Sequence, residues 1–138
     1  TAAVPGLPPL TGGLVGARLS AIPGATDVFV GGVTSYASAV KHDLLGVDEG
    51  PVVSEEAARQ MADGARRLLG ADVAIATTGV AGPDTQEGQE VGTVFLGLAV
   101  GDDVTSVRLR LPGQRNLIRE LAVISVLAAL RQRLLGVS

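Results

Sequence analysis

Lys41 and Tyr36 are the side chains whose types and spacing most plainly allow chemistry. Lys41 is the only lysine in the chain, Tyr36 is the only tyrosine, and the other ten basic side chains are arginines. A lysine ammonium can lose its proton when it is desolvated, whereas an arginine guanidinium effectively never does. A phenol beside the lysine can relay that proton or stabilise its transfer. The pair therefore indicates a general-base site. The alternative interpretation is a single lysine surviving in a composition that favours arginine.

Three glycine-containing segments adjoin predicted element ends and are candidates for binding an anion or a carbonyl oxygen. They are residues 11–13 (TGG), 77–83 (TTGVAGP) and 112–115 (PGQR). The first lies at a predicted helix start, where backbone N–H groups favour a phosphate or a carboxylate. The second follows a predicted strand, and ligands commonly bind beyond the carboxyl ends of strands in α/β sheets. The third places Arg115 at a helix start, where it can clamp an anion. Taken alone, each segment also fits a structural role: helix packing, a tight turn or a solvated arginine.

The acidic residues and the histidine do not suggest a second kind of site. The acidic pairs fit a helix start, a loop or a turn, and they are Glu55 with Glu56, Glu87 with Glu90, and Asp102 with Asp103. A two-carboxylate acid–base site is therefore not predicted. His42 is the only histidine and is interpreted as a surface residue, and the chain has no cysteine. These counts exclude a multi-histidine or thiolate metal site.

Helices and strands must alternate to position these segments. Helices are predicted over residues 11–21, 37–45 and 115–135, and between an N-cap at Ser54 and a stop at Gly70. Strands are predicted over residues 28–36, 73–78, 91–100 and 104–111. Residues 4–9 hold three prolines and are expected to be neither a helix interior nor a central strand. Gly31-Gly32 is expected to mark a bulge or a close backbone approach. This order of elements predicts an α/β sheet covered by helices.

Apolar spacing also predicts the buried faces of the two longest helices. The helix after Ser54 is expected to bury Ala57, Ala58, Met61, Ala62, Ala65, Leu68 and Leu69. The last helix is expected to bury Leu117, Ile118, Leu121, Ala122, Leu127 and Leu130.

Composition limits the class of protein. The 138 residues suit a single domain with its own core. Because 46% of the residues are hydrophobic but only 2% are aromatic, this core must consist of Val, Leu, Ile and Ala. The formal net charge of -3 gives no basic footprint for nucleic acid. No apolar run reaches the ~18 residues that cross a bilayer, so the chain suits the cytoplasm. It starts with Thr1 and not with Met, which leaves open a longer parent protein.

Taken together, these segments resemble the CinA C-terminal domain family, whose members include competence-damage-inducible proteins. The resemblance runs from Leu10 to about Leu135. It rests on ordered motifs at residues 10–15 (LTGGLV), 23–26 (PGAT), 32–36 (GVTSY) followed by Lys41, 44–47 (LLGV), 53–55 (VSE), 78–83 (TGVAGP), 91–94 (VGTV) and 112–115 (PGQR). Several such motifs in one order are far more specific than any one of them.

The resemblance implies a three-layer α/β/α fold with a mixed central sheet, and an amidohydrolase of the pyridine nucleotide cycle. Such a hydrolase cleaves the carboxamide of nicotinamide mononucleotide, without metal or cofactor, to nicotinate mononucleotide and ammonia. The implied partner is this small nucleotide, and neither a nucleic acid nor a membrane is expected as a partner. Assembly into a homo-oligomer is left open. The family's catalytic tyrosine and lysine fall on Tyr36 and Lys41, and a family hydroxyl falls on Thr26, the expected nucleophile or positioner of a water. The implied substrate-binding residues are Thr11, Gly12, Gly13, Thr78, Gly79, Gly82 and Arg115.

Two departures from the family pattern support an alternative function. Leu7-Pro8-Pro9 stands where the family usually carries Ala-Glu-Ser, so a proline replaces the serine. The stretch between Val47 and Val53 is also shorter than the family pattern. A proline has neither a hydroxyl nor a backbone N–H to offer a substrate. The alternative is therefore a catalytically silent domain that binds a nucleotide or mediates assembly.

Overall fold

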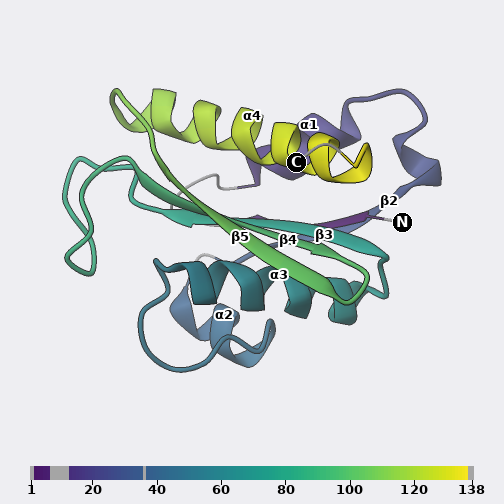
Figure 1. Cartoon of the computed structure of the whole chain (residues 1–138), viewed down its shortest axis with the longest axis horizontal. Coiled ribbons are helices and arrows are strands. Elements are labelled where there is room, and N and C mark those ends of the chain that lie inside the picture. The colour runs from purple at the N-terminus through teal and green to yellow at the C-terminus, as the bar shows by residue number, and fades with distance from the viewer. Residues whose placement is uncertain (1, 7–12, 36, 137–138) are drawn as a thin grey trace.

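A mixed five-stranded sheet lies between two layers of helices in the computed structural model, which describes residues 2–6, 13–35 and 37–136 (Figure 1). In chain order the elements are β1 (Ala2–Gly6), α1 (Leu14–Ser20), the 3-10 helix η1 (Ala25–Asp27), β2 (Phe29–Thr34), α2 (Ser38–Asp43), α3 (Glu55–Leu69), β3 (Val73–Gly79), β4 (Thr93–Val100), β5 (Asp103–Arg110) and α4 (Arg115–Leu134). The predicted α/β/α fold with a mixed sheet is confirmed.

The strand order is β2-β1-β3-β4-β5, with β2, β1 and β3 parallel and the last two pairings antiparallel. The carboxyl ends of β2, β1 and β3 therefore meet at one edge of the sheet. We call this the carboxyl edge; β4 begins there at Thr93 and β5 ends there at Arg110. It lies at the left of Figure 1, beside the loop of residues 80–92 and the start of α4. In open α/β sheets this is the edge where ligands bind.

The N-terminal strand corrects one expectation. Residues 4–6 were expected to lie outside any central strand, yet they belong to β1, which lies between β2 and β3. Pro5 is tolerated because, within the described part of β1, only Ala2 and Ala3 pair with β3, so residues 4–6 have no ladder on that side. The rest of the proline-rich stretch, residues 7–9, lies outside the described residues.

The expected irregularity near Gly31-Gly32 falls one residue earlier. Ala2 pairs with Phe29 and Ala3 pairs with Gly31, so Val30 is an extra residue in β2. This is the arrangement of a β-bulge.

The two helical layers differ in the size of their side chains. Helices α1 and α4 cover one face of the sheet, and α2 and α3 cover the other (Figure 1). Against α3 the sheet presents small residues such as Ala74 and Ala76, whereas Ile75, between them in β3, packs on the α4 side with Leu96 and Leu98. Successive strand residues point to opposite faces. Strand β4 is buried on both faces, as its apolar run predicts.

Helix α3 begins and ends where the sequence indicates. The Ser54 side chain accepts a hydrogen bond of 3.0 Å from the Ala57 N–H, and Gly70 ends the helix in the left-handed conformation with φ 62°. Leu68 is wrong as a core residue, because it is 46% exposed.

Helix α4 buries a slightly different stripe from the one expected. Ile118 and Ala122 are buried as predicted, and Val126 continues this i, i+4 row. Leu117 is 49% exposed and is wrong as a core residue. Within the described residues, no helix combines the length and the apolar character needed to cross a membrane.

A glycine in α3 brings the end of α2 close to that helix. A Cβ atom at Gly64 would lie 1.8 Å from the backbone oxygen of Leu45, the second residue after α2, which is 2% exposed. No side chain fits in that space. Gly64 therefore lets the segment that carries Lys41 pack directly on α3.

We predict that Gly64→Ala destabilises the fold although alanine is the better helix former. Helix propensity alone would add about 1 kcal/mol, but the clash with the Leu45 backbone should leave a net loss of about 1–3 kcal/mol. Urea unfolding midpoints measure the difference. The matched control is Gly16→Ala in α1, where the new Cβ would lie 3.8 Å from Phe29 Cζ, an ordinary contact. A Gly64→Ala protein as stable as the parent would contradict the close packing.

Candidate functional site

Five of the ten predicted site residues lie at the carboxyl edge. Lys41 lies on α2, the helix that follows β2, and Thr78 and Gly79 are the last two residues of β3. Gly82 lies in the 80–92 loop, and Arg115 begins α4. The parallel strands β2 and β3 lead to Lys41 and to Thr78 and Gly79 at this edge, and the antiparallel strands β4 and β5 bring Arg115 to it.

The Lys41 amine is the most unusual group of this edge. The residue is 3% exposed, and its Nζ donates a hydrogen bond of 3.2 Å to the backbone oxygen of Ser35, which is itself fully buried. Burial lowers the pKa of Lys41 from its ordinary value of 10.5, and the negative charge of Glu87 raises it, opposing part of that effect. Such an amine loses its proton more readily than a solvated lysine does. It therefore meets the chemical requirement for a general base.

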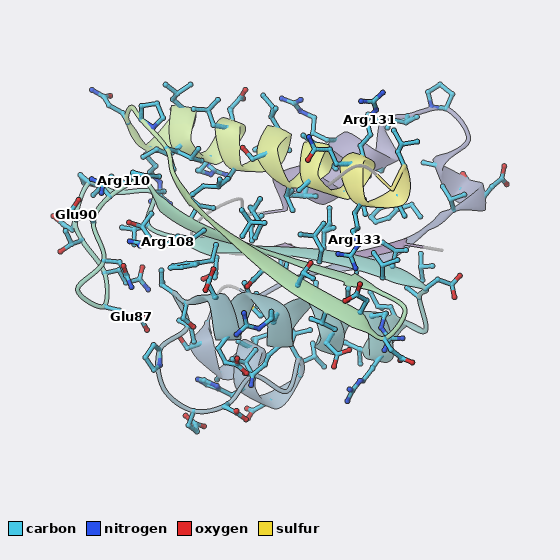
Figure 2. The ribbon with its side chains drawn as sticks, viewed as in Figure 1. Glu87, Glu90, Arg108, Arg110, Arg131 and Arg133 are labelled. Carbon is cyan, nitrogen blue, oxygen red and sulfur yellow. The ribbon has the colours of Figure 1, made fainter. Side chains whose placement is uncertain are left out.

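Glu87 is a member of this site that the sequence did not identify. Its carboxylate accepts hydrogen bonds from the backbone N–H of Val52, at 3.1 and 3.0 Å to its two oxygens, and from that of Val53 at 2.7 Å. Figure 2 shows Glu87 on the 80–92 loop, with Glu90 of the same loop beside Arg110, its ion-pair partner. The polar composition of the loop gave no signal, because Val52 lies 35 residues away in sequence.

Thr78 holds the same short segment from the sheet side. Its hydroxyl donates a hydrogen bond of 2.6 Å to the backbone oxygen of Val52, and the residue is 3% exposed. The Val52-Val53 pair is thus fixed through its carbonyl by Thr78 and through its amides by Glu87. The Thr78 hydroxyl thus donates its proton to the Val52 backbone oxygen and not to a substrate in this structure.

Neither glycine of the TGVAGP segment has room for a side chain. A Cβ atom at Gly79 would lie 2.5 Å from the backbone oxygen of Thr93. Gly82 has φ +90°, a conformation that other residues rarely adopt, and a Cβ atom there would lie 2.8 Å from Val91 Cγ1. The loop therefore passes very close to the start of β4, with its backbone at the carboxyl edge.

Arg115 ties the start of α4 to this loop. Its Nη1 donates a hydrogen bond of 2.9 Å to the backbone oxygen of Gly82. Among the described residues, the N-cap Gln114 provides no side-chain hydrogen bond to the first turn of α4. A pocket of about 510 Å³ opens here, lined by Ala81, Pro83, Val91, Gly113, Gln114, Arg115 and Asn116. Its volume is in the usual range for a small-molecule site.

Thr26 is the predicted site residue that the structure does not bring to Lys41. It is exposed in η1, before the start of β2, whereas Lys41 follows the end of that strand (Figure 1). A strand of six residues spans about 20 Å, so the two residues lie toward opposite edges of the sheet. The expectation that the Thr26 hydroxyl works beside the lysine within one chain is therefore not supported by the geometry.

The remaining predicted residues lie near or outside the described part. Gly13 is the N-cap of α1, with φ 94°, and a Cβ atom there would lie 3.3 Å from Thr34 Oγ1 at the carboxyl edge. Thr11, Gly12 and Tyr36 lie outside the described residues. Within the described residues, no three His, Asp or Glu side chains gather closely enough to hold a metal ion.

Comparisons with known proteins agree on one family. The family model of the CinA C-terminal domain matches residues 9–134. A CinA-like protein of Frankia casuarinae is 48% identical over 132 residues, which is 92% of this chain and 30% of that protein. A putative competence-damage inducible protein of Limosilactobacillus fermentum is 46% identical over 127 residues, 87% of this chain and 31% of that protein. The chain thus spans about a third of the length of these curated relatives.

Solved structures show the same fold. A competence-damaged protein (CinA) superfamily protein from Klebsiella pneumoniae superposes with a TM-score of 0.91 at 29% identity, covering 98% of this chain and 86% of that one. A competence/damage inducible protein from Agrobacterium tumefaciens gives a TM-score of 0.84 at 31% identity, covering 94% and 81%.

The lowered pKa of Lys41 predicts a particular dependence of stability on pH. The unfolded chain binds the lysine proton more tightly than the folded chain does, so stability should rise as pH increases from the folded-state pKa toward 10.5. Lys41→Met removes this group and keeps a long unbranched side chain. Urea unfolding of both proteins between about pH 7 and about pH 11 should show the parent gaining stability relative to the variant. Parallel stability curves across that range would contradict the lowered pKa.

Proposed function

The chain belongs to the CinA C-terminal domain family, and we propose that its carboxyl edge hydrolyses the carboxamide of nicotinamide mononucleotide to nicotinate mononucleotide and ammonia. The observation that carries the proposal is Lys41, the only lysine, buried at this edge with a lowered pKa. A lysine acts as a base near neutral pH only when its environment depresses its pKa in this way. We place the reaction in the cytoplasm, which a chain without cysteine suits.

In the proposed reaction a water molecule is the nucleophile. The neutral Lys41 amine takes a proton from the water as its oxygen attacks the carboxamide carbon. Backbone N–H groups of the loop around Gly79 and Gly82 stabilise the negative charge that forms on the carbonyl oxygen. The C–N bond then breaks, and the Lys41 ammonium returns the proton to the leaving nitrogen, which departs as ammonia. Amide and water are thus converted to acid and ammonia with no cofactor.

Water replaces the Thr26 hydroxyl in this scheme because Thr26 lies toward the opposite edge of the sheet. Tyr36 keeps its proposed role as proton relay on the strength of its place in the sequence, five residues before Lys41.

The substrate phosphate is proposed to bind at the start of α4. A guanidinium has five N–H donors in a planar fork, so Arg115 can hold the Gly82 carbonyl and a phosphate oxygen together. The helix start also favours an anion, and the pocket of about 510 Å³ lies there. Residues 11–13, which come before α1 in the sequence, are the second candidate for this phosphate. The substrate would then lie across the carboxyl edge, with its carboxamide toward Lys41 on the α2 side of the sheet.

A catalytically silent domain is the second candidate function, and the replacement of the family serine by Pro9 favours it. The two functions are separated by an ammonia-release assay with nicotinamide mononucleotide on the purified chain. Ammonia production supports the hydrolase. Its complete absence in a folded protein that still binds the nucleotide supports the silent domain.

We predict that Lys41→Arg reduces turnover by about 10²–10⁴-fold, the range for loss of a positioned acid–base group. Arginine keeps the positive charge and cannot accept a proton at neutral pH. Circular dichroism should show that the variant is folded. Arg67→Lys on the exposed side of α3 is the control for an arginine–lysine exchange and should leave turnover unchanged. Near-normal turnover in Lys41→Arg would remove the lysine as the base.

We predict that Arg115→Ala weakens binding more than it slows the chemical step. Loss of a charge-assisted hydrogen bond to the phosphate should raise KM for nicotinamide mononucleotide by about 10–100-fold. The riboside that lacks the phosphate serves as the control substrate, and its KM should change much less. Equal loss for both substrates would indicate that Arg115 acts by holding the Gly82 loop and not by binding phosphate.

A further inference from the structure

Helix α4 carries apolar side chains on two opposite faces. Ile118, Ala122 and Val126 are buried on the face toward the sheet. With about 3.6 residues per turn, Leu117 and Ile124 lie on the far side of the helix, where they are 49% and 52% exposed. That side is at the outer surface of the molecule (Figure 1). The solvent face of a surface helix is normally polar, so an apolar outer face indicates a further packing partner.

The exposed apolar residues of this face form one row along the helix. Its members are exposed or half-buried and lie alternately four and three positions apart; they are Leu117, Leu121, Ile124, Ala128, Arg131 and Leu135, and we call the row the outer stripe. Spacing of this kind lets two helices pack against each other along their length. Single exposed apolar side chains are common, whereas a continuous apolar row marks an interaction surface.

Two exposed charges on one flank of the outer stripe indicate which partner it fits. Glu120 lies in the second turn of α4, and its side chain is 55% exposed beside Arg18 of α1. Arg131 lies in the last turn and is exposed. Figure 2 shows Arg131 on the side of α4 away from the sheet, whereas Arg133 points toward the sheet, where it pairs with Asp103. A partner of the outer stripe should therefore offer a cation near one end and an anion near the other.

A second copy of the same chain offers this arrangement when the two α4 helices run antiparallel. A two-fold axis between Ile124 and Ala128 sets Ile124 of each copy opposite Ala128 of the other, and Leu117 of each copy opposite Leu135 of the other. Such an interface is self-complementary, because the same patch is used on both subunits. The apolar ends of the outer stripe then cover one another.

The same axis pairs the two charges. Glu120 of each copy lies beside Arg131 of the other, and symmetry makes this pair twice. In a parallel arrangement the two side chains would be separated along the helix axis by about 16 Å, too far for an ion pair. Charge complementarity thus favours a second copy in antiparallel orientation over a parallel one.

We propose that the outer stripe of α4 is a self-association surface, which binds the outer stripe of a second copy of this chain in antiparallel orientation. The surface lies on the face of the sheet opposite to α2 and Lys41 (Figure 1). The proposal is therefore independent of the proposed hydrolysis.

The size of the surface sets the expected strength of the dimer. The 20 residues of α4 span about 30 Å. A single pair of such helices buries less than the ~800 Å² per partner of a standard interface, which is typical of weak association. We expect a dissociation constant of about 1–100 µM.

Sedimentation velocity over about 1–500 µM measures this equilibrium. Ile124→Glu places a charge in the middle of the outer stripe on both sides of the axis, and it should raise the dissociation constant by about 10-fold or more. Leu68→Glu is the matched control, since Leu68 is a 46% exposed leucine on α3, on the opposite side of the sheet, and the parent affinity should remain. Circular dichroism should show that both variants are folded. A parent chain that stays monomeric, or an Ile124→Glu variant that dimerises as tightly as the parent, overturns the proposal.

A charge exchange tests the register of the two helices. Glu120→Arg alone and Arg131→Glu alone each create two like-charged pairs, and each should weaken the dimer by about 3–10-fold. The variant with both changes restores two opposite-charge pairs and should return to nearly the parent affinity. Loss of the Arg18 contact within the chain is common to Glu120→Arg and to the double variant, so recovery isolates the effect at the interface. A double variant as weak as the sum of the single changes would overturn the proposed register.

The orientation can be read from disulfide formation, because the chain has no cysteine of its own. Leu117→Cys and Leu135→Cys are introduced into separate chains, and the two positions lie about 27 Å apart along one helix. In an antiparallel pair the two variants should form a mixed disulfide when they are combined and oxidised, since each position meets the other across the axis. Disulfides that join each variant only to itself would indicate parallel helices and overturn the proposal.

Discussion

Desolvation of the Lys41 amine is the constraint on which the organisation of this protein depends. A charged amine away from water destabilises a fold unless nearby groups compensate. Here the Ser35 carbonyl accepts its hydrogen bond and the Glu87 charge opposes part of the effect of burial. The connection between α2 and α3, which follows Lys41 in the chain, is fixed at both of its ends. Packing of Leu45 on Gly64 fastens one end, and the bonds of Thr78 and Glu87 to Val52 fasten the other.

The mixed sheet explains how such distant segments reach one place. Three parallel strands bring the starts of three different connections to a single edge, and the antiparallel return through β4 and β5 brings the beginning of α4 to the same edge. The glycines at 79 and 82 then let the 80–92 loop turn tightly against the start of β4. The candidate base, the loop amides and the arginine are thus gathered by topology and not by closeness in sequence.

The features that the sequence predicted correctly are those decided locally. Ser54 and Gly70 mark the ends of α3 because capping involves residues within one turn, and β4 reads as a buried strand because its own residues are apolar on both faces. The sequence predictions were wrong or incomplete where the structure of a residue depends on partners that are distant in sequence. Pro5 is accepted in β1 only because β3 leaves one side of that strand unpaired, which no local pattern reveals. Glu87 resembled any loop glutamate, and Thr26 was placed by a family motif that does not say at which edge of the sheet a residue lies.

The thin layer between α3 and the sheet has a consequence for how this fold can vary. A Cβ atom at Gly97 of β4 would lie 2.0 Å from the backbone oxygen of Ala58, so strand and helix touch through their main chains. The opposite layer is filled by larger branched side chains around Ile118, Val123 and Leu96. Branched side chains can exchange volume with one another, whereas main chains in contact cannot. Side-chain substitutions are therefore expected to be tolerated more readily in the α4 layer than in the α3 layer, on which the segment after Lys41 packs.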